Sequence, residues 1–343
     1  MRIILVGYGV VGQSLTKIFI KRRVELSKNY GFHPRVVAIA DRGGAAINPK
    51  GLELEKMLLT KNEKGTVAAD SKFGHPEMSP LEVINSVEAE ALVEISPTNV
   101  RNGEPALSHI KNAFKAGKHV VTTNKGPLAL ALPALTELAE HNQVYFRFSG
   151  SVGAGTPILE FAKRCLFGVK ILSVRGVLNG TTNFILTEMS EKHIAFDHAL
   201  KKAQELGYAE ADPTMDIDGI DTACKIVIIA NWVLGKKVTL RDVDVKGIRG
   251  VTMKDIEDAS KENCAVKLVG SISDKLEVKP TKVYKTDPLC VSGTLNAVTF
   301  VSEFAGEQTI TGYGAGGVET ASAILRDLMY IKQKLAAQLL VNV

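Results

Sequence analysis

Short apolar runs alternate with amphipathic stretches from Met1 to about Ser149. Runs rich in Val, Ile and Phe predict strands at RIILVG, VVAIAD, EALVEIS, HVVTTN and VYFRFS. Between them, apolar residues recur at helical spacing in SLTKIFIKRRVELSK, EPALSHIKNAFKAG and PALTELAEHN. This alternation predicts a parallel sheet with helices on both faces. The stretch from Arg42 to Val87 is the least regular, and we expect helices at LELEKMLL and PLEVINS within it.

The pattern changes after the glycine-rich turn GSVGAG. The next predicted elements are a helix at TPILEFAKRCL, a strand at ILSVRGVL, a loop at NGTTN, and helices at FDHALKKAQELG and CKIVIIANWVLG. Strand-like runs near KLEVKPTKVY, LCVSGTLNAVTFVS and QTITGYG indicate an antiparallel layer. The expected fold is therefore α/β, a Rossmann-type doubly wound parallel sheet followed by a second, α+β domain.

The last predicted helix, VETASAILRDLMYIKQKLAAQLL, follows the turn GYGAGG and is expected to return to the first domain. We therefore expect residues 1–149 plus about 307–343 to form a dinucleotide-binding domain. Residues 150–306 would form the substrate-binding domain.

Composition narrows the class of protein. The 343 residues are 45% hydrophobic and 23% charged, which is typical of a globular chain with two or three domains. The net charge of +5 is small and the basic residues are scattered, so we expect no nucleic-acid partner. No run reaches the roughly 18 apolar residues of a membrane helix, and we expect a cytoplasmic protein. The four cysteines lack CxxC spacing, so we expect them to be reduced and buried, without zinc (Cys165, Cys224, Cys264 and Cys290).

The start of the chain, MRIILVGYGVVGQSL, has the glycine spacing of a dinucleotide fingerprint between a strand and a helix. Gly7 would permit the tight turn, Gly9 the approach of a pyrophosphate, and Gly12 close packing of the helix on the strand. The alternative is a glycine-rich turn with a structural role. Asp41, after the second strand, could accept a ribose hydroxyl and indicate NAD, whereas Arg42 could pair with a 2′-phosphate and indicate NADP.

Other candidates follow predicted strands of the same sheet. Lys125 comes after HVVTTN, and Ser96 and Thr98 follow EALVEI. Open α/β sheets bind ligands at the carboxyl ends of their strands, so these positions suit a cofactor or substrate. The alternative for Lys125 is an ordinary loop lysine.

The block GYAEADPTMDIDGIDTACK joins several carboxylates to a lysine at the start of an apolar helix. Asp221 and Lys225 are four residues apart and so share one helix face. The alternative is a surface ion pair, but the apolar run from Ile226 to Ala230 favours a half-buried pair. Glu210 and Asp216 are candidates for binding an ammonium group, since crowded carboxylates repel one another unless a cation compensates.

Two further acidic residues of this block are more ambiguous. Asp212 and Asp218 are equally well explained as solvated turn residues, or Asp218 as the N-cap of the next helix. The spacing does not match that of a calcium-binding loop.

Over nearly its whole length the chain resembles the homoserine dehydrogenase family. The resemblance rests on GYGVVG, TTNKGPLA, GSVGAGTPI, GVLNGTTNFI, the acidic block and GYGAGGVETASAILRDL, of which the acidic block is the most specific. It implies an NAD(P)-dependent oxidoreductase that interconverts L-aspartate 4-semialdehyde and L-homoserine in threonine, methionine and isoleucine biosynthesis.

The resemblance also implies roles for individual residues. Lys225 would donate and accept the proton, and Lys125 would be a second active-site lysine. Glu210, Asp216, Asp221 and Thr181 would hold the substrate. The residues implied to line the cofactor are Gly7, Val10, Val11, Gly12, Ser96, Thr98, Lys125, Gly207 and Gly316.

Metal, assembly and regulation follow from the same resemblance. Members of the family commonly carry Na+ on backbone carbonyls of the segment matching Val152, Ala154 and Thr156, with a glutamate just before it. Here Ser149 stands at the glutamate position, which counts against the ion. Short relatives are homodimers that pair through the sheet of the second domain, and LCVSGTLNAVTFVS suggests an exposed edge. We expect no C-terminal ACT-type amino-acid-sensing domain.

Two alternatives belong to other classes. A phosphorylating aspartate-semialdehyde dehydrogenase needs a nucleophilic cysteine, and Cys224 alone lies near the proposed site in the sequence. A cofactor-binding sensor without catalysis would have no use for the two lysines.

Overall fold

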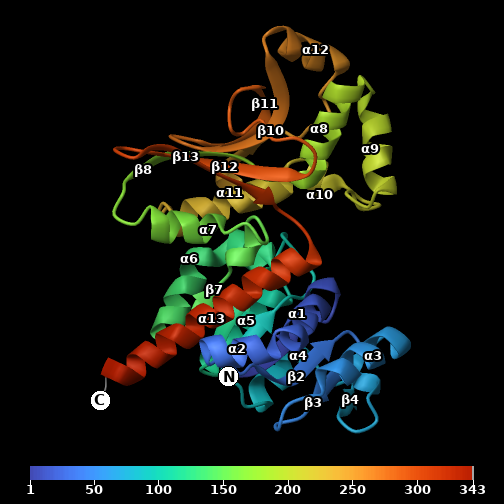
Figure 1. The fold of residues 1–343 in the computed structure, drawn as a ribbon, viewed down its shortest axis with the longest axis vertical. Helices are drawn as coiled ribbons and strands as arrows, with labels where there is room; N and C mark the ends of the chain where they lie inside the picture. The colour runs from blue at the N-terminus through green and yellow to red at the C-terminus, as the bar shows by residue number, and fades with distance from the viewer. Residues whose placement is uncertain (342–343) are drawn as a thin grey trace. The chain divides into compact units, whose positions relative to one another are not determined.

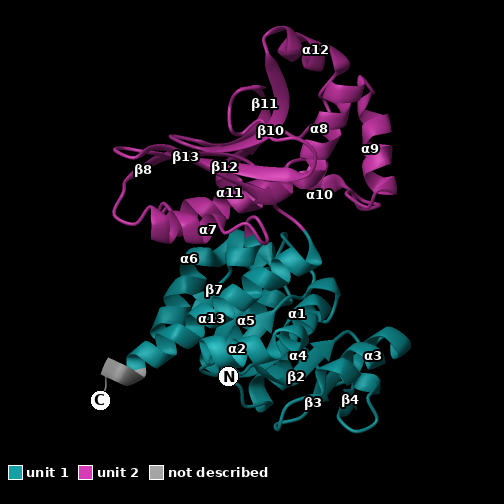
Figure 2. Cartoon of the chain, viewed as in Figure 1, with its two compact units in different colours: residues 1–151, 316–343 teal, residues 152–315 magenta. Residues whose placement is uncertain are grey.

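The computed structural model describes residues 1–341, which form two compact units (Figure 2). Unit 1 comprises Met1–Ser151 and the segment from Gly316 onward, and unit 2 comprises Val152–Ala315. The chain therefore passes between the units twice. The second passage lies beyond the return expected near residue 307, because β13 (Gly306–Tyr313) pairs along its length with β12 (Leu295–Ser302) in unit 2.

Unit 1 is built on a seven-stranded sheet with the order β4-β3-β2-β1-β5-β6-β7. Figure 1 labels β2, β3, β4 and β7 among these strands. The five strands from β2 to β7 in this order are parallel, as predicted, and β3 and β4 extend one edge in antiparallel fashion. The strands are β1 (Arg2–Val6), β2 (Arg35–Asp41), β3 (Gly44–Ile47), β4 (Gly74–Pro76), β5 (Ala91–Glu94), β6 (His119–Thr122) and β7 (Phe146–Arg147).

The helices of unit 1 form two groups, as expected for a sheet covered on both faces. Helix α1 contacts α2, α3 and α13, while α5 contacts α4 and α6. Both faces of the sheet must be covered by helices, because every residue of β1 from Ile3 to Val6 is buried and alternate residues point to opposite faces. The helices are α1 (Val10–Lys21), α2 (Arg23–Tyr30), α3 (Leu54–Lys64), α4 (Pro80–Ser86), α5 (Ala106–Lys115), α6 (Lys125–His141) and α13 (Gly317–Val341).

One predicted helix of unit 1 is divided in the structure. The segment SLTKIFIKRRVELSK falls into α1 and α2, because Arg22 leaves helical geometry at φ −102° and ψ 10°. The bend lets Leu26 reach the core, where it joins Leu15 and Phe19 of α1 and Leu328 of α13. Burial of one such side chain stabilises the fold by about 1.5–3 kcal/mol.

The strand order of unit 1 reverses at β1. The chain leaves β1 for β2 on one side and later returns to β5 on the other side. At such a switch point the connecting loops diverge and leave a crevice at the carboxyl ends of the strands. Gly7 follows β1 and Ser96 follows β5, so both residues border this crevice.

Unit 2 contains a six-stranded sheet with the order β13-β12-β8-β10-β11-β9. Neighbouring strands are antiparallel except β9 with β11. Strand β12 lies between β13 and β8, so the expectation of an exposed edge at LCVSGTLNAVTFVS is wrong; β13 and β9 are the two edge strands. The remaining strands are β8 (Ile171–Val177), β9 (Val243–Val245), β10 (Cys264–Ile272) and β11 (Leu276–Tyr284).

Helix α11 (Ile220–Trp232) is a buried helix of unit 2. Its residues from Asp221 to Ala230 are all buried, which accounts for its apolar sequence, and it packs on β10 and β11. The close approach depends on Gly270 of β10, where an added Cβ would lie 2.6 Å from a side-chain carbon of Ile226. The other helices are α7 (Ile158–Glu160), α8 (Gly180–Lys192), α9 (Phe196–Glu205), α10 (Thr214–Ile217) and α12 (Met253–Lys261).

Across residues 1–341, no helix combines the length and the apolar composition that crossing a bilayer demands.

Candidate active site

The turn after β1 has the geometry that the glycine fingerprint predicts. Gly7 adopts φ +101°, and a Cβ there would collide with the carbonyl oxygen of Ile95. A Cβ at Gly12 would lie 2.7 Å from the Gly7 carbonyl oxygen, whereas a Cβ at Gly9 would meet open space. Helix α1 starts with its N-terminal N–H groups uncapped by a side chain, beside an exposed Val10 and a half-buried Val11. An uncapped helix start in this setting can bind an anion.

The loops after β5 and β6 lie at the same end of the sheet. Asn124 caps α6 by accepting the Gly126 N–H at 3.2 Å, which places Lys125 at the first position of the helix. The Asn124 amide also donates to the carbonyl oxygen of Ser96 at 3.1 Å. Thr98 is exposed beyond that loop.

The start of α13 joins this part of unit 1. An added Cβ at Gly317 would lie 2.5 Å from a side-chain carbon of Val10, so the turn GYGAGG lies against the beginning of α1. Gly316 has φ +126°, which favours glycine. The structure thus gathers predicted cofactor residues from four separate segments of unit 1.

Asp41 is engaged by its own unit. One carboxylate oxygen accepts from Gly43 N–H at 2.9 Å and from the Thr66 hydroxyl at 2.6 Å. The other accepts from the Lys61 ammonium at 2.8 Å and from Val67 N–H at 3.1 Å. Burial raises the pKa of Asp41, but these hydrogen bonds outweigh burial and hold its pKa below the usual range. The adjacent Arg42 is exposed.

Unit 2 brings part of the acidic block together around Asn179. The Asn179 amide donates to Asp216 at 2.6 Å and to Asp221 at 2.9 Å, while its oxygen caps α8 through Thr182 N–H at 2.8 Å. Lys225 donates to Asp221 at 2.7 Å across one helical turn, as predicted. The Lys225 side chain is only 7% exposed, so the pair is not a surface ion pair.

Lys225 has a second partner that fixes its direction. Its ammonium donates to the carbonyl oxygen of Leu178 at 2.5 Å, and the same oxygen accepts from the Asn296 amide at 3.0 Å. Two of the three ammonium donors are therefore used, which leaves one N–H to offer to a bound molecule.

Asp216 is the carboxylate of this cluster whose charged form is disfavoured by its surroundings. Burial, followed by the nearby charge of Asp221, raises the pKa of Asp216, although the amide of Asn179 and the charge of Lys225 act in the opposite direction. The charged form of such a carboxylate would be stabilised by a bound cation. Thr181 lies beside it at the start of α8, with its hydroxyl donating to the Tyr208 carbonyl oxygen at 2.6 Å.

Other predicted residues of the block lie on the surface of unit 2. Glu210 is exposed, and its backbone carbonyl accepts from the Gln204 amide at 3.2 Å. Asp212 accepts from Thr214 N–H at 3.1 Å, as a turn residue would. Asp218 pairs with Arg249, and the N-cap of α11 is Gly219, so the expectation of an Asp218 cap is wrong. Gly207 has φ +75° in the loop after α9.

Two of the positions proposed for sodium already take part in hydrogen bonds. The Thr156 carbonyl oxygen already accepts from Ile158 N–H at 2.8 Å. The Ser149 hydroxyl accepts from the Arg326 guanidinium at 3.2 Å, which places a positive group where a carboxylate is expected. Within residues 1–341, no three His, Cys, Asp or Glu side chains are grouped to hold a metal.

The four cysteines form no disulfide. Cys224 and Cys264 are buried as expected, but Cys165 is exposed and Cys290 half-buried, so the expectation that all four are buried is wrong. Cys165 is the last residue of a π-helical turn, Phe161–Cys165, and lies on the surface.

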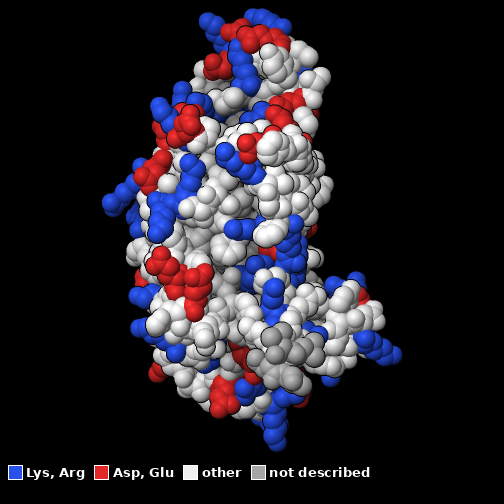
Figure 3. Space-filling view, turned by 90° about the vertical axis from the view of Figure 1, so that its left-hand side faces the viewer, with Lys and Arg blue, Asp and Glu red and all other residues white. Residues whose placement is uncertain are grey.

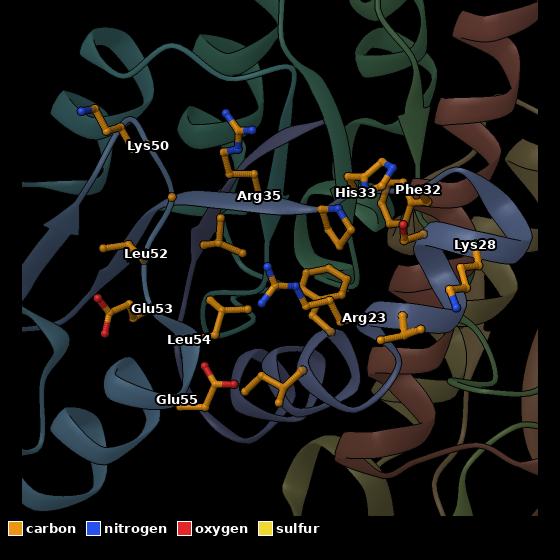
Figure 4. Close-up of a pocket in the computed structure, with 17 residues that line it drawn as sticks. Arg23, Lys28, Phe32, His33, Arg35, Lys50, Leu52, Glu53, Leu54 and Glu55 are labelled. Atoms are coloured by element: carbon orange, nitrogen blue, oxygen red, sulfur yellow. The ribbon is translucent and has the colours of Figure 1, made fainter.

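A hollow of about 790 Å³ lies elsewhere in unit 1, at the amino-terminal end of β2. Its wall includes Phe19 and Leu52, and in Figure 4 the charged groups of Arg23, Arg35 and Lys50 point in different directions. On the face of the molecule shown in Figure 3, basic and acidic side chains are interspersed, so the described residues of this face form no extended patch of a single charge. Because open α/β sheets bind ligands at the opposite, carboxyl ends, this hollow is not the cofactor site.

Sequence reasoning missed the amide groups of the site. Asn179, Asn296 and Asn124 hold the carboxylates, the Leu178 carbonyl and the start of α6. Asn179 had a usable signal, since asparagine directly before a helix is a favoured N-cap. Asn296 lies within a strand far along the chain, and the sequence gives no signal for it.

Family models cover most of the chain. The model described as homoserine dehydrogenase, NAD binding domain, matches residues 7–149, and the homoserine dehydrogenase model matches residues 157–329.

Curated relatives match end to end. A homoserine dehydrogenase of Methanocaldococcus jannaschii is 47% identical over 332 residues, which is 96% of this chain and 98% of the relative. An NAD(+)-dependent homoserine dehydrogenase of Pseudomonas canavaninivorans is 39% identical over 97% of this chain and 96% of its own.

Solved structures agree with these matches. A putative homoserine dehydrogenase from Archaeoglobus fulgidus has a TM-score of 0.89 and 39% identity, covering 96% of this chain and 99% of that one. A hyperthermophilic archaeal homoserine dehydrogenase in complex with NADPH has a TM-score of 0.85 and 32% identity, covering 97% and 98%.

Proposed function

We propose, from the premise that this chain belongs to the homoserine dehydrogenase family, that Lys225 and Lys125 are its catalytic lysines. The enzyme is an NAD(P)-dependent oxidoreductase that interconverts L-aspartate 4-semialdehyde and L-homoserine. What remains to be assigned is the role of each residue, the choice of cofactor and the assembly.

The Lys225 amine is the proton donor and acceptor in this proposal. The nicotinamide, when bound, supplies or accepts the hydride. Reduction of an aldehyde places negative charge on its oxygen, and the unused N–H of Lys225 would donate to that oxygen. Asp221 and the Leu178 carbonyl hold the ammonium in one direction. Lys125 is proposed as the second catalytic lysine on the family resemblance alone. The single observation that carries this assignment is the buried ammonium of Lys225 with two fixed acceptors.

Asp216 and Asp221 bind the substrate's α-ammonium in this proposal. Burial, followed by the nearby charge of Asp221, raises the pKa of Asp216, and a bound cation would stabilise its charged form. Thr181 lies beside Asp216, and Glu210 is proposed on the family resemblance alone.

Substitution of Lys225 tests its role. Lys225→Met keeps the length of the stem but removes the proton donor, so kcat should fall by roughly two orders of magnitude or more. The measurement is steady-state nicotinamide reduction with homoserine.

A matched control is available in the same unit. Lys267 is also a buried lysine of unit 2, and it donates to the amide oxygen of Asn183 at 2.9 Å. Lys267→Met should therefore reproduce any loss of stability without the loss of kcat. Near-normal turnover by Lys225→Met would refute the assignment.

NADP(H) is the cofactor that we propose. Both oxygens of Asp41 are occupied within unit 1, and Lys61 neutralises the carboxylate that would otherwise repel a 2′-phosphate. Arg42 stays exposed beside it and can form paired hydrogen bonds with a phosphate. The remaining cofactor residues would be the glycines and valines of the first turn (Gly7, Gly9, Val10, Val11 and Gly12), Ser96, Thr98, Lys125, Gly207 and Gly316.

Removal of the Arg42 guanidinium tests this choice. Arg42→Gln should raise the KM for NADP+ by roughly tenfold or more and leave the KM for NAD+ unchanged, because a charged hydrogen-bond pair is lost for the phosphate only. Arg35→Gln removes an equal charge at the opposite end of the same strand and should change neither constant. An unchanged KM for NADP+ in Arg42→Gln would exclude this role.

The sodium ion does not fit the residues present. Ser149 supplies a hydroxyl bound to a guanidinium in place of a carboxylate, so we derive no step through a metal. We propose a homodimer, supported by the unpaired edge of β13, and a reducing compartment such as the cytoplasm, supported by four cysteines without disulfides.

A further inference from the structure

A fully enclosed carboxylate lies at the end of β5. Glu94 is the last residue of that strand, and its side chain has no exposed surface. Ionisable groups are almost never buried in this way unless they are hydrogen-bonded, because desolvation is costly. The catalytic proposal gives Glu94 no role, so its contacts need a separate explanation.

Both oxygens of Glu94 accept hydrogen bonds from neighbouring loops. One oxygen faces the Ser96 hydroxyl, the Ser96 N–H at 3.2 Å and the Nδ1 atom of the buried His109 at 3.4 Å. The other accepts from the hydroxyl of Thr122, at the end of β6, at 3.2 Å. The Glu94 side chain is therefore hydrogen-bonded both to the loop that follows β5 and to the end of the neighbouring strand β6.

The network continues from Thr122 to the first residues of α6. The Thr122 hydroxyl accepts from Asn124 N–H at 3.0 Å. The Asn124 amide returns to the first loop, donating to the carbonyls of Ser96 at 3.1 Å and Pro97 at 3.3 Å, and its oxygen caps α6. The position of Lys125 is thus linked to that of Ser96.

The same loop also supports the glycine turn. Gly7 lies so close to the Ile95 carbonyl that no Cβ could fit between them. A shift of residues 95–97 would therefore disturb the turn after β1 as well as the start of α6. Three segments assigned to the cofactor depend on one buried side chain.

We propose that Glu94 is a positioning residue that sets the shape of the cofactor site by holding the loops after β5 and β6 in register. The inference rests on the proposed cofactor roles of Ser96 and Lys125. What the network needs from position 94 is an acceptor toward Ser96 and a polar group toward Thr122. Glutamine meets both needs, since its amide can donate to the Thr122 hydroxyl while that hydroxyl donates to the Glu94 backbone carbonyl at 2.9 Å. Leucine meets neither.

The test compares NADPH affinity in the full-length enzyme. Glu94→Leu and the isosteric Thr122→Val should each raise the Kd for NADPH, measured by fluorescence titration, by roughly tenfold or more. Glu94→Gln should stay within about threefold of the parent protein. The KM for homoserine, whose proposed ligands belong to unit 2, should change much less than the Kd for NADPH.

A control separates positioning from simple destabilisation. Asp70 is another buried carboxylate of unit 1, and it accepts from Phe73 N–H at 2.9 Å in a loop outside the network. Asp70→Ala should lower the Tm without changing the Kd for NADPH.

Each outcome decides the question. Weak NADPH binding by the Leu and Val variants, with recovery in Glu94→Gln, supports the proposal. A fall in Tm with an unchanged Kd would show that the network is structural only and overturn it. If Glu94→Gln binds as poorly as Glu94→Leu, hydrogen-bond geometry is not what position 94 supplies, and the proposal also fails. Should Glu94→Leu not fold, Thr122→Val decides alone. Failure of the parent protein to bind NADPH would instead reject the cofactor assignment and this inference with it.

Discussion

At the scale of single residues, the site combines two carboxylates, one lysine and the amide that joins them. Asn179 donates to both Asp216 and Asp221, and Lys225 neutralises only Asp221 directly. Asp216 is left as a half-buried carboxylate without a cation in contact. Its charged form lowers the stability of the free enzyme, and a bound cationic substrate would stabilise it. Groups that lower stability in this way are common at functional sites.

The raised pKa of Asp216 predicts that Asp216→Asn changes thermal stability in a pH-dependent way. The pKa of Asp216 is raised by burial and by Asp221, so its contribution to stability falls as pH rises from the ordinary aspartate pKa through the raised value. At pH 7.5 the amide variant should therefore melt higher than the parent, and the difference should vanish below about pH 4, the ordinary pKa of an aspartate. Its KM for homoserine should rise. Thermal melts at both pH values measure the first effect.

Asp212→Asn serves as the opposite-sign control. Hydrogen bonds from Thr214 lower the pKa of Asp212, so this exposed carboxylate favours folding at neutral pH and its amide variant should show no gain. A lower Tm for Asp216→Asn at pH 7.5 would contradict the claim that the charged form of Asp216 destabilises the free enzyme.

At the scale of elements, the sequence was informative where one residue pattern decides the structure. Strands with continuous apolar runs, such as β1 and β2, and the glycine turn between β1 and α1 could all be predicted, because their burial and φ requirements are local. The pairing of Asp221 with Lys225 could be predicted for the same reason, since helical spacing alone brings them together.

Elements that depend on distant partners could not be predicted. Strand β10 contains Lys267, whose buried ammonium donates to Asn183 and Thr187 of α8. It also contains Gly270, where Ile226 of α11 packs too closely for a side chain. Both residues weaken the local strand pattern. Glu210 shows the converse, since charge crowding suggested that it joins Asp216, whereas the chain places it on the surface.

At the scale of the whole molecule, the open edge of unit 2 predicts assembly. Strand β13 is paired on one side only, and exposed edges of this kind readily pair with another chain. We expect light scattering after size exclusion to give twice the chain mass of 36.9 kDa. Ile310→Lys, which puts a charge on this edge, should shift the population toward monomer.

The corresponding substitution in unit 1 provides the control. Val24→Lys adds the same charge at a position that is 65% exposed and should leave the mass unchanged. A monomeric parent protein at micromolar concentration would disprove the dimer.

The double passage of the chain between the units has a consequence for synthesis. Unit 2 is complete once Ala315 has left the ribosome, but unit 1 still lacks α13 at that moment. Ala321, Ile324 and Leu328 fill its core, and Asp327 receives the Arg147 guanidinium at 3.3 Å and the Ser149 N–H at 2.8 Å. The first unit to emerge is therefore finished after the second, and a nascent chain cannot complete unit 1 until α13 has been synthesised.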